Sequence, residues 1–144
     1  MARVEPYSPV AARIYAFLAN TERFTGGDLA KSDLLIAKSL HLARRFGDPA
    51  TTIVALEAKG TMLRSLRKAK WGEYRETTVE IIALEAANPT LQLGLGKREV
   101  LIERILEIGR ARDALRFAHR HLVEARKEML PSSICATLHY MMIA

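Results

Sequence analysis

The fold is decided by the stretch from Asp48 to Met129, which holds two copies of one sequence unit. The first copy, residues 48–89, reads DPATTIVALEAKGTMLRSLRKAKWGEYRETTVEIIALEAANP. Serine, aspartate and asparagine are favoured N-cap residues, and proline is favoured at the first position of a helix. Such pairs recur at a constant interval along the chain, as Ser8-Pro9, Asp48-Pro49 and Asn88-Pro89. Each pair therefore predicts the start of a helix.

Pro131 continues this series, because it follows Pro89 at nearly the same interval. A period of roughly 40 residues in a helical pattern is typical of stacked helical hairpins. We therefore predict an all-α fold, an α-solenoid of antiparallel helical hairpins with about seven helices. The 144 residues are expected to form one helical-repeat domain. Its predicted repeats cover approximately 9–48, 49–88, 89–130 and, in part, 131–144.

Further sequence signals indicate where the first four helices begin and end. The helix from Pro9 is expected to run for roughly a dozen residues, because its apolar positions keep helical spacing over that length. Asp28 is expected to cap the second helix, and Gly47 is expected to follow its end. The fourth helix is expected to open at Trp71, after a short basic turn.

The second half of the chain is expected to hold three more helices. Asn88-Pro89 is predicted to open the fifth, in which Gly94 and Gly96 either kink the helix or delay its regular start. The clearest amphipathic helix runs from Arg110 to Met129. A seventh helix after Pro131 is apolar to the end of the sequence. Either the chain is part of a longer array, or it self-associates through this C-terminal helix.

Composition narrows the classes of protein. Hydrophobic residues make up 49% and charged residues 26% of the chain, which is an ordinary balance for a globular protein. The single Cys135 excludes an internal disulfide and fits a reducing cytoplasm, where we expect the protein to be. A net charge of +6 permits an acidic partner but does not demand one, because 16 carboxylates are interleaved with 22 Lys and Arg.

Several motifs together resemble tetratricopeptide-like (TPR-like) repeats over about residues 26–144. The closest likeness is to the divergent repeats in the C-terminal parts of large bacterial LuxR-type and antibiotic-regulatory ATP-binding transcription factors. There, such segments sense effectors or make protein contacts. Two residues depart from the pattern, since Ala69 replaces a turn glycine and Tyr74 replaces a small residue. The motifs are Ala43-Arg44-Arg45-Phe46-Gly47-Asp48-Pro49, Ala55-Leu56-Glu57-Ala58-Lys59-Gly60, Lys70-Trp71-Gly72-Glu73 and Glu107-Ile108-Gly109-Arg110-Ala111-Arg112-Asp113-Ala114-Leu115.

The resemblance implies a non-catalytic module of a bacterial regulator of transcription. It implies that the matched residues Trp71, Gly109, Ala114 and Leu115 are structural, and no catalytic residue carries over. The expected function is therefore binding of a protein, a peptide or an effector, with no enzyme activity and no cofactor.

Cations beside aromatic residues form the best candidate for a binding surface. Such groups can hold phosphates, stack on bases or bind an acidic peptide. A structural interpretation is open as well, in which Lys68 and Lys70 keep a turn soluble and Trp71 packs the hairpin. The candidate partner-binding residues are Arg64, Arg67, Lys68, Lys70, Trp71, Tyr74 and Arg75, together with Arg110, Arg112 and Arg116 one repeat later.

If the repeats stack in register, the two basic clusters line one edge of the solenoid. This arrangement favours a protein or an acidic peptide as the partner. The alternative function is nucleic-acid binding through the same basic turns, which would depend steeply on salt. No membrane partner is expected.

The remaining groups of histidine, glycine, serine and cysteine residues do not predict a metal, phosphate-binding or catalytic site. His119 and His121 are two residues apart, so on a helix they point roughly 200° apart and cannot share one metal ion. Residues 94–97 read GLGK and lack the spacing of a phosphate-binding loop. Ser132 and Ser133 are interpreted as helix caps, and Cys135 as a small core residue. We therefore expect no metal site and no catalytic residue.

Overall fold

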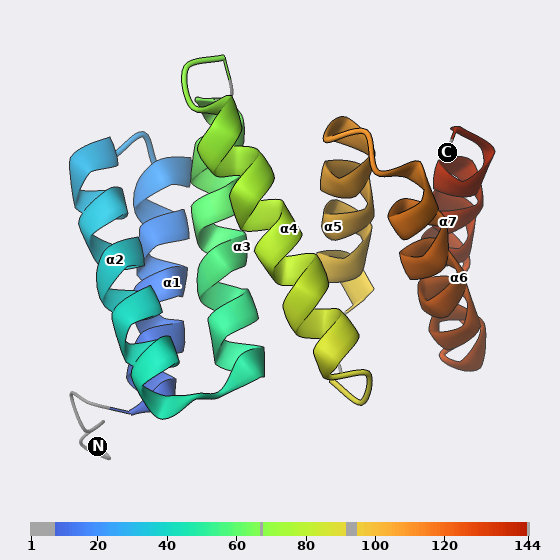
Figure 1. The fold of residues 1–144 in the computed structure, drawn as a ribbon, viewed down its shortest axis with the longest axis horizontal. Coiled ribbons are helices and arrows are strands. Elements are labelled where there is room, and N and C mark those ends of the chain that lie inside the picture. Colours follow the sequence, from blue (N-terminus) through green and yellow to red (C-terminus); the bar gives the residue numbers. More distant parts are fainter. Residues whose placement is uncertain (1–7, 67, 92–94, 144) are drawn as a thin grey trace. The chain divides into compact units, whose positions relative to one another are not determined.

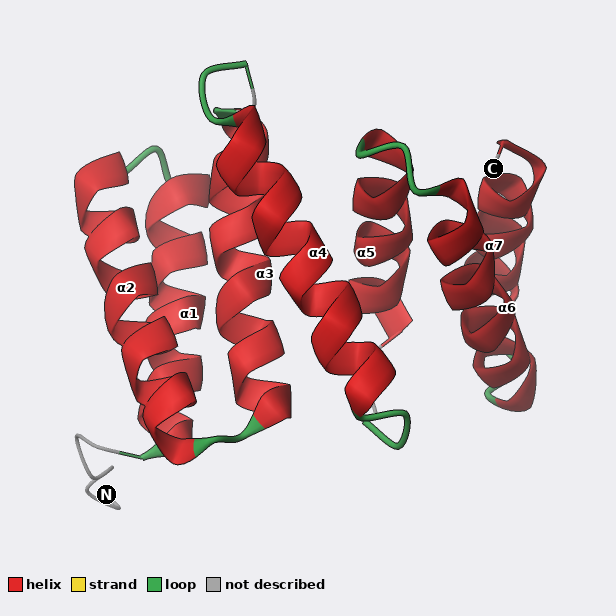
Figure 2. Cartoon of the chain, in the orientation of Figure 1, coloured by secondary structure: helices red, strands yellow, loops and turns green. Residues whose placement is uncertain are grey.

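The computed structural model describes residues 8–66, 68–91 and 95–143 (Figure 1). These residues form seven α-helices and no strand (Figure 2), so the prediction of an all-α fold is confirmed. The helices are α1 (Pro9–Phe24), α2 (Leu29–Phe46), α3 (Pro49–Ser65), α4 (Trp71–Ala87), α5 (Leu95–Glu107), α6 (Ala111–Lys127) and α7 (Pro131–Ile143).

The chain divides into two compact units. Unit 1 is Met1–Leu91 and contains α1 to α4, and unit 2 is Gln92–Ala144 and contains α5 to α7. The expectation of a single domain over 1–144 stays a prediction.

Side-chain caps start the first three helices at the predicted residues. Ser8 Oγ accepts a hydrogen bond from the amide of Ala11 at 3.2 Å, and Asp28 Oδ1 accepts one from the amide of Ala30 at 2.8 Å. Asp48 caps α3. Gly47 lies directly after α2 with φ of 62°, a left-handed conformation that glycine adopts without steric cost. The capping predictions for these helices are confirmed.

Small residues let α1 and α2 approach closely. The buried residues of α1 are all alanine, although the helix is 16 residues long. Two buried serines of α2 face this surface, and their hydroxyls donate to main-chain carbonyls of α1. Ser32 Oγ donates to the carbonyl of Ala19 at 3.0 Å, and Ser39 Oγ donates to the carbonyl of Ala12 at 2.7 Å. Both serines and both alanines are seven residues apart, so the two contacts repeat every two turns.

The third helix joins the first pair to α4. It packs against α1, α2 and α4. Arg13 of α1 reaches its N-terminus, where its Nε donates to Thr51 Oγ1 at 3.0 Å and its Nη2 lies 3.6 Å from Asp48 Oδ2. The N-cap of α3 therefore also fixes α3 against α1.

The start of the fifth helix differs from the prediction. Asn88-Pro89 does not open a helix, because α5 begins at Leu95. Asn88 instead caps the end of α4, where its Nδ2 donates to the carbonyl of Leu84 at 2.8 Å and its amide donates to Glu85 at 3.2 Å. The delayed start of the helix is thus the correct alternative, although Gly94 lies outside the described residues.

The helices of unit 2 contact one another in the same pattern as α1, α2 and α3. In each group of three, the first helix contacts the second and the third, and the second contacts the third. A polar link fixes α5 against α6: Arg98 is buried, and its Nη1 lies 2.5 Å from Glu124 Oε2. Next to it, His121 Nε2 lies 3.3 Å from Glu99 Oε1.

The ends of α5 and α6 have matching hydrogen bonds. The amides of Gly109 and Arg110 donate to the carbonyls of Leu106 and Ile105, at 2.9 and 3.1 Å. After α6, the amides of Met129 and Leu130 donate in the same way to the carbonyls of Arg126 and Ala125, at 3.3 and 3.1 Å. This pair of bonds is the Schellman motif, whose C′ residue is left-handed. Met129, which was predicted to be the last residue of this amphipathic helix, is the C′ residue after α6 and is 82% exposed.

The last helix carries the apolar surface that the sequence suggested. Thr137 is buried in α7, whereas Leu138, Met142 and Ile143 are exposed. Covering of this surface in an assembly stays a prediction. Across the described part of the chain, none of the helices combines the length and the apolar character that crossing a bilayer requires.

Candidate partner-binding surface

The turn between α3 and α4 is held by its own main chain. The amides of Ala69 and Lys70 both donate to the carbonyl of Leu66, at 2.9 and 3.0 Å. Ala69 therefore closes the turn where the repeat pattern has glycine. Lys70 is the N-cap of α4, yet its side chain makes no capping hydrogen bond. Its Nζ lies 3.6 Å from Glu73 Oε1 in the first turn of the helix.

The two aromatic residues of this segment lie in different environments. Trp71 is 43% exposed, so its indole is partly buried, and both interpretations of this residue stay predictions. Tyr74 is fully buried, so its ring is not available to a partner and this residue is removed from the candidate surface. Trp71 is the first residue of α4, whereas Tyr74 lies one turn further inside the helix, and its buried ring packs against the indole.

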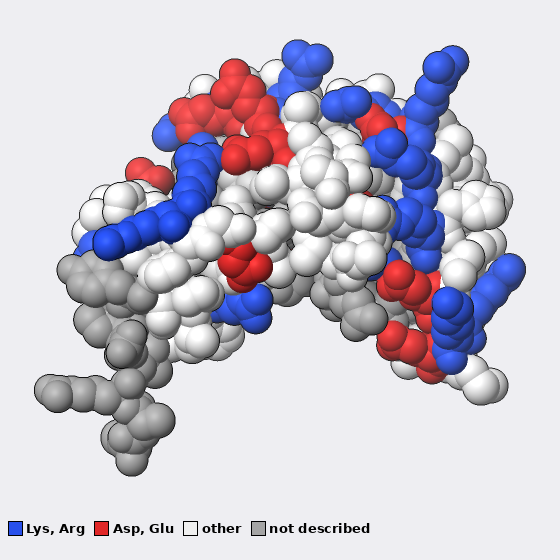
Figure 3. Space-filling model, turned by 60° about the horizontal axis from the view of Figure 1, so that its bottom comes forward, with Lys and Arg blue, Asp and Glu red and all other residues white. Residues whose placement is uncertain are grey.

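The cationic candidates that lie near Trp71 in the sequence differ in exposure. Lys68 and Arg75 are exposed and form no ion pair among the residues that the structure describes, while Arg64 is half-buried. Arg67 lies outside the described residues. On the face shown in Figure 3, basic side chains are interspersed with acidic ones.

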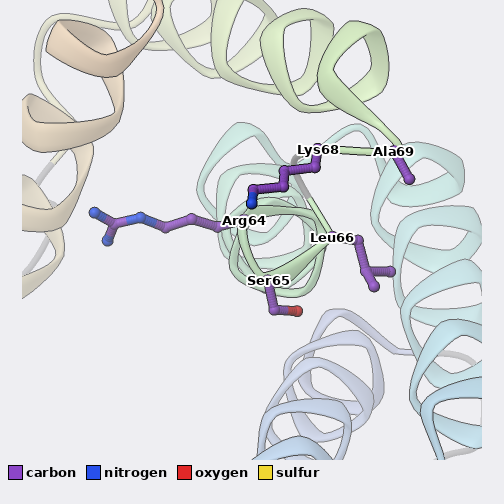
Figure 4. Close-up of a pocket in the computed structure, with 5 residues that line it drawn as sticks. All are labelled: Arg64, Ser65, Leu66, Lys68 and Ala69. Atoms are coloured by element: carbon purple, nitrogen blue, oxygen red, sulfur yellow. The ribbon is translucent and has the colours of Figure 1, made fainter.

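A shallow depression of about 570 Å³ lies at the C-terminal end of α3. Figure 4 shows that Arg64 and Leu66 extend in opposite directions from this end of the helix. The carbonyls at a helix C-terminus attract cations and repel anions. A ligand pocket normally has polar groups that converge on one point, and this depression lacks that arrangement. It is lined by Arg64, Ser65, Leu66, Lys68 and Ala69.

Two arginines of the second basic cluster share one carboxylate. Arg110 Nε lies 2.6 Å from Asp113 Oδ2, and Arg116 Nη2 lies 3.1 Å from Asp113 Oδ1. Arg112 is exposed and has no ion pair within the described ranges. The net positive charge of this cluster is therefore smaller than its three arginines suggest. It lies in unit 2 and the first cluster lies in unit 1, so a shared edge stays a prediction.

The structure places the residues that resemble the TPR-like pattern in different environments. Gly109 is left-handed, with φ of 76°, and Ala114 is buried, which agrees with the structural roles expected of them. Leu115 is instead partly exposed, at 36%. The pattern thus places the small residues correctly and the large ones less well.

The two histidines of α6 lie in different environments, since His121 is fully buried and His119 is exposed. Three residues of α7 differ from their interpretation in the sequence. Cys135 is exposed and is not a core residue. Since α7 begins at Pro131, Ser132 and Ser133 lie inside its first turn and do not precede it.

Sequence reasoning missed one surface altogether. The outer side of α1 exposes large apolar side chains, among them Phe17 and Phe24. The regular spacing of these residues along the helix is the signal that could have indicated this surface.

Comparison with known proteins adds no relative. Neither the models of protein families nor the curated proteins nor the solved structures contain a match to this chain.

Proposed function

We propose that this chain is a non-catalytic binding module, a segment of TPR-like helical repeats that binds a protein or an acidic peptide. The observation that carries the proposal is the pairing of an exposed tryptophan with exposed cations at one inter-helix turn. The parent protein, on this proposal, is a larger bacterial regulator of transcription, as the resemblance of the repeats suggests.

The helix contacts support a repeat architecture. In TPR-like stacks, each repeat contributes two antiparallel helices, and the first helix of the next repeat packs against both. The groups α1, α2, α3 and α5, α6, α7 both have these contacts. The caps Ser8 and Asp48 start α1 and α3 at equivalent positions of successive repeats.

The surface around Trp71 supports binding of an acidic partner. Tryptophan and arginine dominate the energy of many interfaces, because they combine a large contact area with polar groups. Trp71 is held over Tyr74 and needs little ordering when it binds. Lys68 and Arg75, which have no ion pair among the described residues, supply charge for carboxylates. Effectors small enough to need a closed pocket are less well suited, since the nearby depression is open.

Fluorescence tests the proposal directly, because Trp71 is the only tryptophan in the sequence. The probes are a panel of acidic peptides that carry one or two leucines, with the same peptides in which glutamine replaces every acidic residue. We expect acidic peptides to shift the emission of Trp71 and the glutamine versions to leave it unchanged. If no acidic peptide shifts the emission, the proposal is wrong.

Charge reversal locates the site. The double variant Lys68→Glu, Arg75→Glu is expected to raise the dissociation constant of such a peptide by about tenfold or more. The matched control reverses two exposed lysines elsewhere, Lys38→Glu and Lys127→Glu, and keeps the same net charge. An equal loss of affinity in both variants would show that only net charge matters.

Nucleic-acid binding is the second candidate, because the net charge is +6. Oligothymidine and a short RNA duplex serve as probes, with salt varied from about 50 to about 200 mM. An affinity of the wild type that falls by orders of magnitude over this range, and that Lys68→Glu, Arg75→Glu also weakens, would favour nucleic acid. Peptide binding with partner selectivity should survive the same change in salt.

A further inference from the structure

The outer side of α1 has the spacing of a coiled-coil seam. Its positions follow one another at intervals of 4, 3, 4 and 3 residues, which is the heptad pattern of helices that pack along their length. They lie opposite the buried alanines, since Ala12, Ala16 and Ala19 form the inner side. We define the α1 seam as Val10, Ile14, Phe17, Thr21 and Phe24.

Large apolar side chains of the seam are exposed to water. Phe17 is 70% exposed and Phe24 is 74% exposed, while Val10 and Ile14 are exposed as well. The one polar member, Thr21, donates its hydroxyl to the carbonyl of Phe17 at 3.1 Å. Its hydrogen bond is therefore satisfied within α1, and the seam presents no unsatisfied polar group to a partner helix.

The exposed area is large enough to form an interface. With Leu18 beside it, the seam leaves roughly 500 Å² of apolar surface in water, close to the largest patch on a typical monomer. Two copies of the patch would bury about 1,000 Å², the lower limit for a specific contact. The helix is also preformed, because α2 and α3 hold its other side. Docking therefore costs little conformational entropy.

The charges beside the seam are already engaged. Arg13 contacts Thr51 and Asp48, and the guanidinium of Arg23 lies over the ring of Phe24, 4.3 Å from its centroid. A membrane-surface helix would instead line its polar face with free Lys and Arg. A charged peptide would bind selectively only if the seam offered an unpaired charge of the opposite sign. The surface fits an uncharged apolar helix.

A second α1 is such a helix, and the seam is complementary to itself. Val10 and Phe24 lie seven residues on either side of Phe17. An antiparallel pair centred on Phe17 therefore places Val10 of each copy opposite Phe24 of the other. Opposed helix dipoles also favour the antiparallel direction.

We propose that two copies of this chain associate through the α1 seam in an antiparallel, two-fold symmetric contact. The contact is isologous, so it closes at the dimer. It differs from self-association through α7 and does not depend on the binding of any partner at Trp71.

Sedimentation equilibrium of the full chain between about 5 and about 500 µM tests the proposal. The wild type is expected to be a dimer at the upper end of this range. Phe17→Glu is expected to raise the dimer dissociation constant by about 30-fold or more, because it places two carboxylates at the centre of the contact. Its circular dichroism should match the wild type, and so should its melting temperature at concentrations where both proteins are monomeric, since Phe17 contributes little to the core.

Matched controls carry the same substitution on other exposed apolar residues. Leu34→Glu on α2 and Met142→Glu on α7 should leave the dimer intact. A wild type that stays monomeric up to about 500 µM, or a dimer that Met142→Glu disrupts and Phe17→Glu does not, would overturn the proposal. Co-sedimentation of the wild type with phosphatidylcholine or phosphatidylserine vesicles, lost in Phe17→Glu, would overturn it in favour of a membrane surface.

Discussion

The rings of Trp71 and Tyr74 lie with their centroids 5.7 Å apart and their planes tilted by 39°. One ring is partly exposed and the other is buried, so the tyrosine forms a fixed support under the indole. Such tilted contacts are favourable between aromatic rings. Trp71, at the start of α4, is thus a surface residue, and Tyr74, one turn later, is a core residue.

Truncation of the two rings should affect stability unequally. Trp71→Ala is expected to lower the free energy of unfolding by about 1 kcal/mol, because much of the indole is in water. Tyr74→Ala is expected to cost about 3–5 kcal/mol, because it leaves a cavity in the core of unit 1. Urea denaturation followed by circular dichroism measures both. Equal losses would show that the indole is a core residue after all.

The cap of α3 should make stability depend on pH. The Thr51 hydroxyl, which donates to the Asp48 carboxylate, lowers the pKa of Asp48 below its ordinary value, and the amides of Thr51 and Ala50 and the charge of Arg13 act in the same direction. A lowered pKa stabilises the fold above the pKa of the unfolded chain. This contribution should disappear as the pH falls from about 4 through the lower pKa of the folded state.

Two variants isolate this effect. Asp48→Ala should cost roughly 1 kcal/mol at pH 7, the usual value for a lost N-cap, and should flatten the fall in stability below pH 4. Thr51→Val keeps the carboxylate but removes the principal donor, so it should reduce the pH dependence only in part. If stability falls below pH 4 as steeply in both variants as in the wild type, Asp48 is not the cause of the pH dependence.

The close contact between α1 and α2 should tolerate a loss of atoms better than a gain. Ser39→Ala removes one buried hydrogen bond, and we expect a cost of about 1 kcal/mol. Ser39→Leu must force the helices apart, and we expect a cost of 3 kcal/mol or more, at about the upper end for overpacked cores. Thermal denaturation of both variants, with Leu34→Ala as an exposed control on the same helix, measures the difference. A leucine that is tolerated would mean that the helices are not in close contact.

The end of α6 offers a stabilising substitution. Met129 has φ of 51°, a left-handed conformation that costs a residue with a side chain about 1 kcal/mol. Met129→Gly should therefore raise the free energy of unfolding by about 0.5–1 kcal/mol, since the exposed side chain contributes little packing. Gly109→Ala is the reciprocal test at the matching end of α5, and it should lower stability by about 1 kcal/mol. A destabilising Met129→Gly would contradict the argument.

Local patterns predicted most of the helices, because capping depends on a few neighbouring residues. Ser8, Asp28 and Asp48 start helices for reasons that are visible within four residues of each. Asn88 has the same local signature, yet its amide side chain also suits a helix end, and there it binds a carbonyl of α4. The sequence alone could not decide between these two uses of one side chain.

The candidate site was predictable only in part. The exposure of Lys68 follows from its place at a turn, whereas Arg75 lies inside α4. The burial of Tyr74 beneath Trp71 depends on which side of α4 meets α3, and this is a property of packing. The ion pairs of Arg110 and Arg116 with Asp113 could have been found, because all three residues lie within two turns of one helix and its cap.

In α1, the residues that hold the helix in place and the large apolar residues exposed to water lie on opposite sides. The alanines of α1 and the two serines of α2 opposite them specify the position of this helix, so Phe17 and Phe24 on its outer side, which are 70% and 74% exposed, contribute little to folding. The exposed residues on the outer side of α1 can therefore be substituted. A designer could replace Phe17 and its neighbours with the epitope of another protein and obtain a scaffold of unchanged architecture with a new specificity.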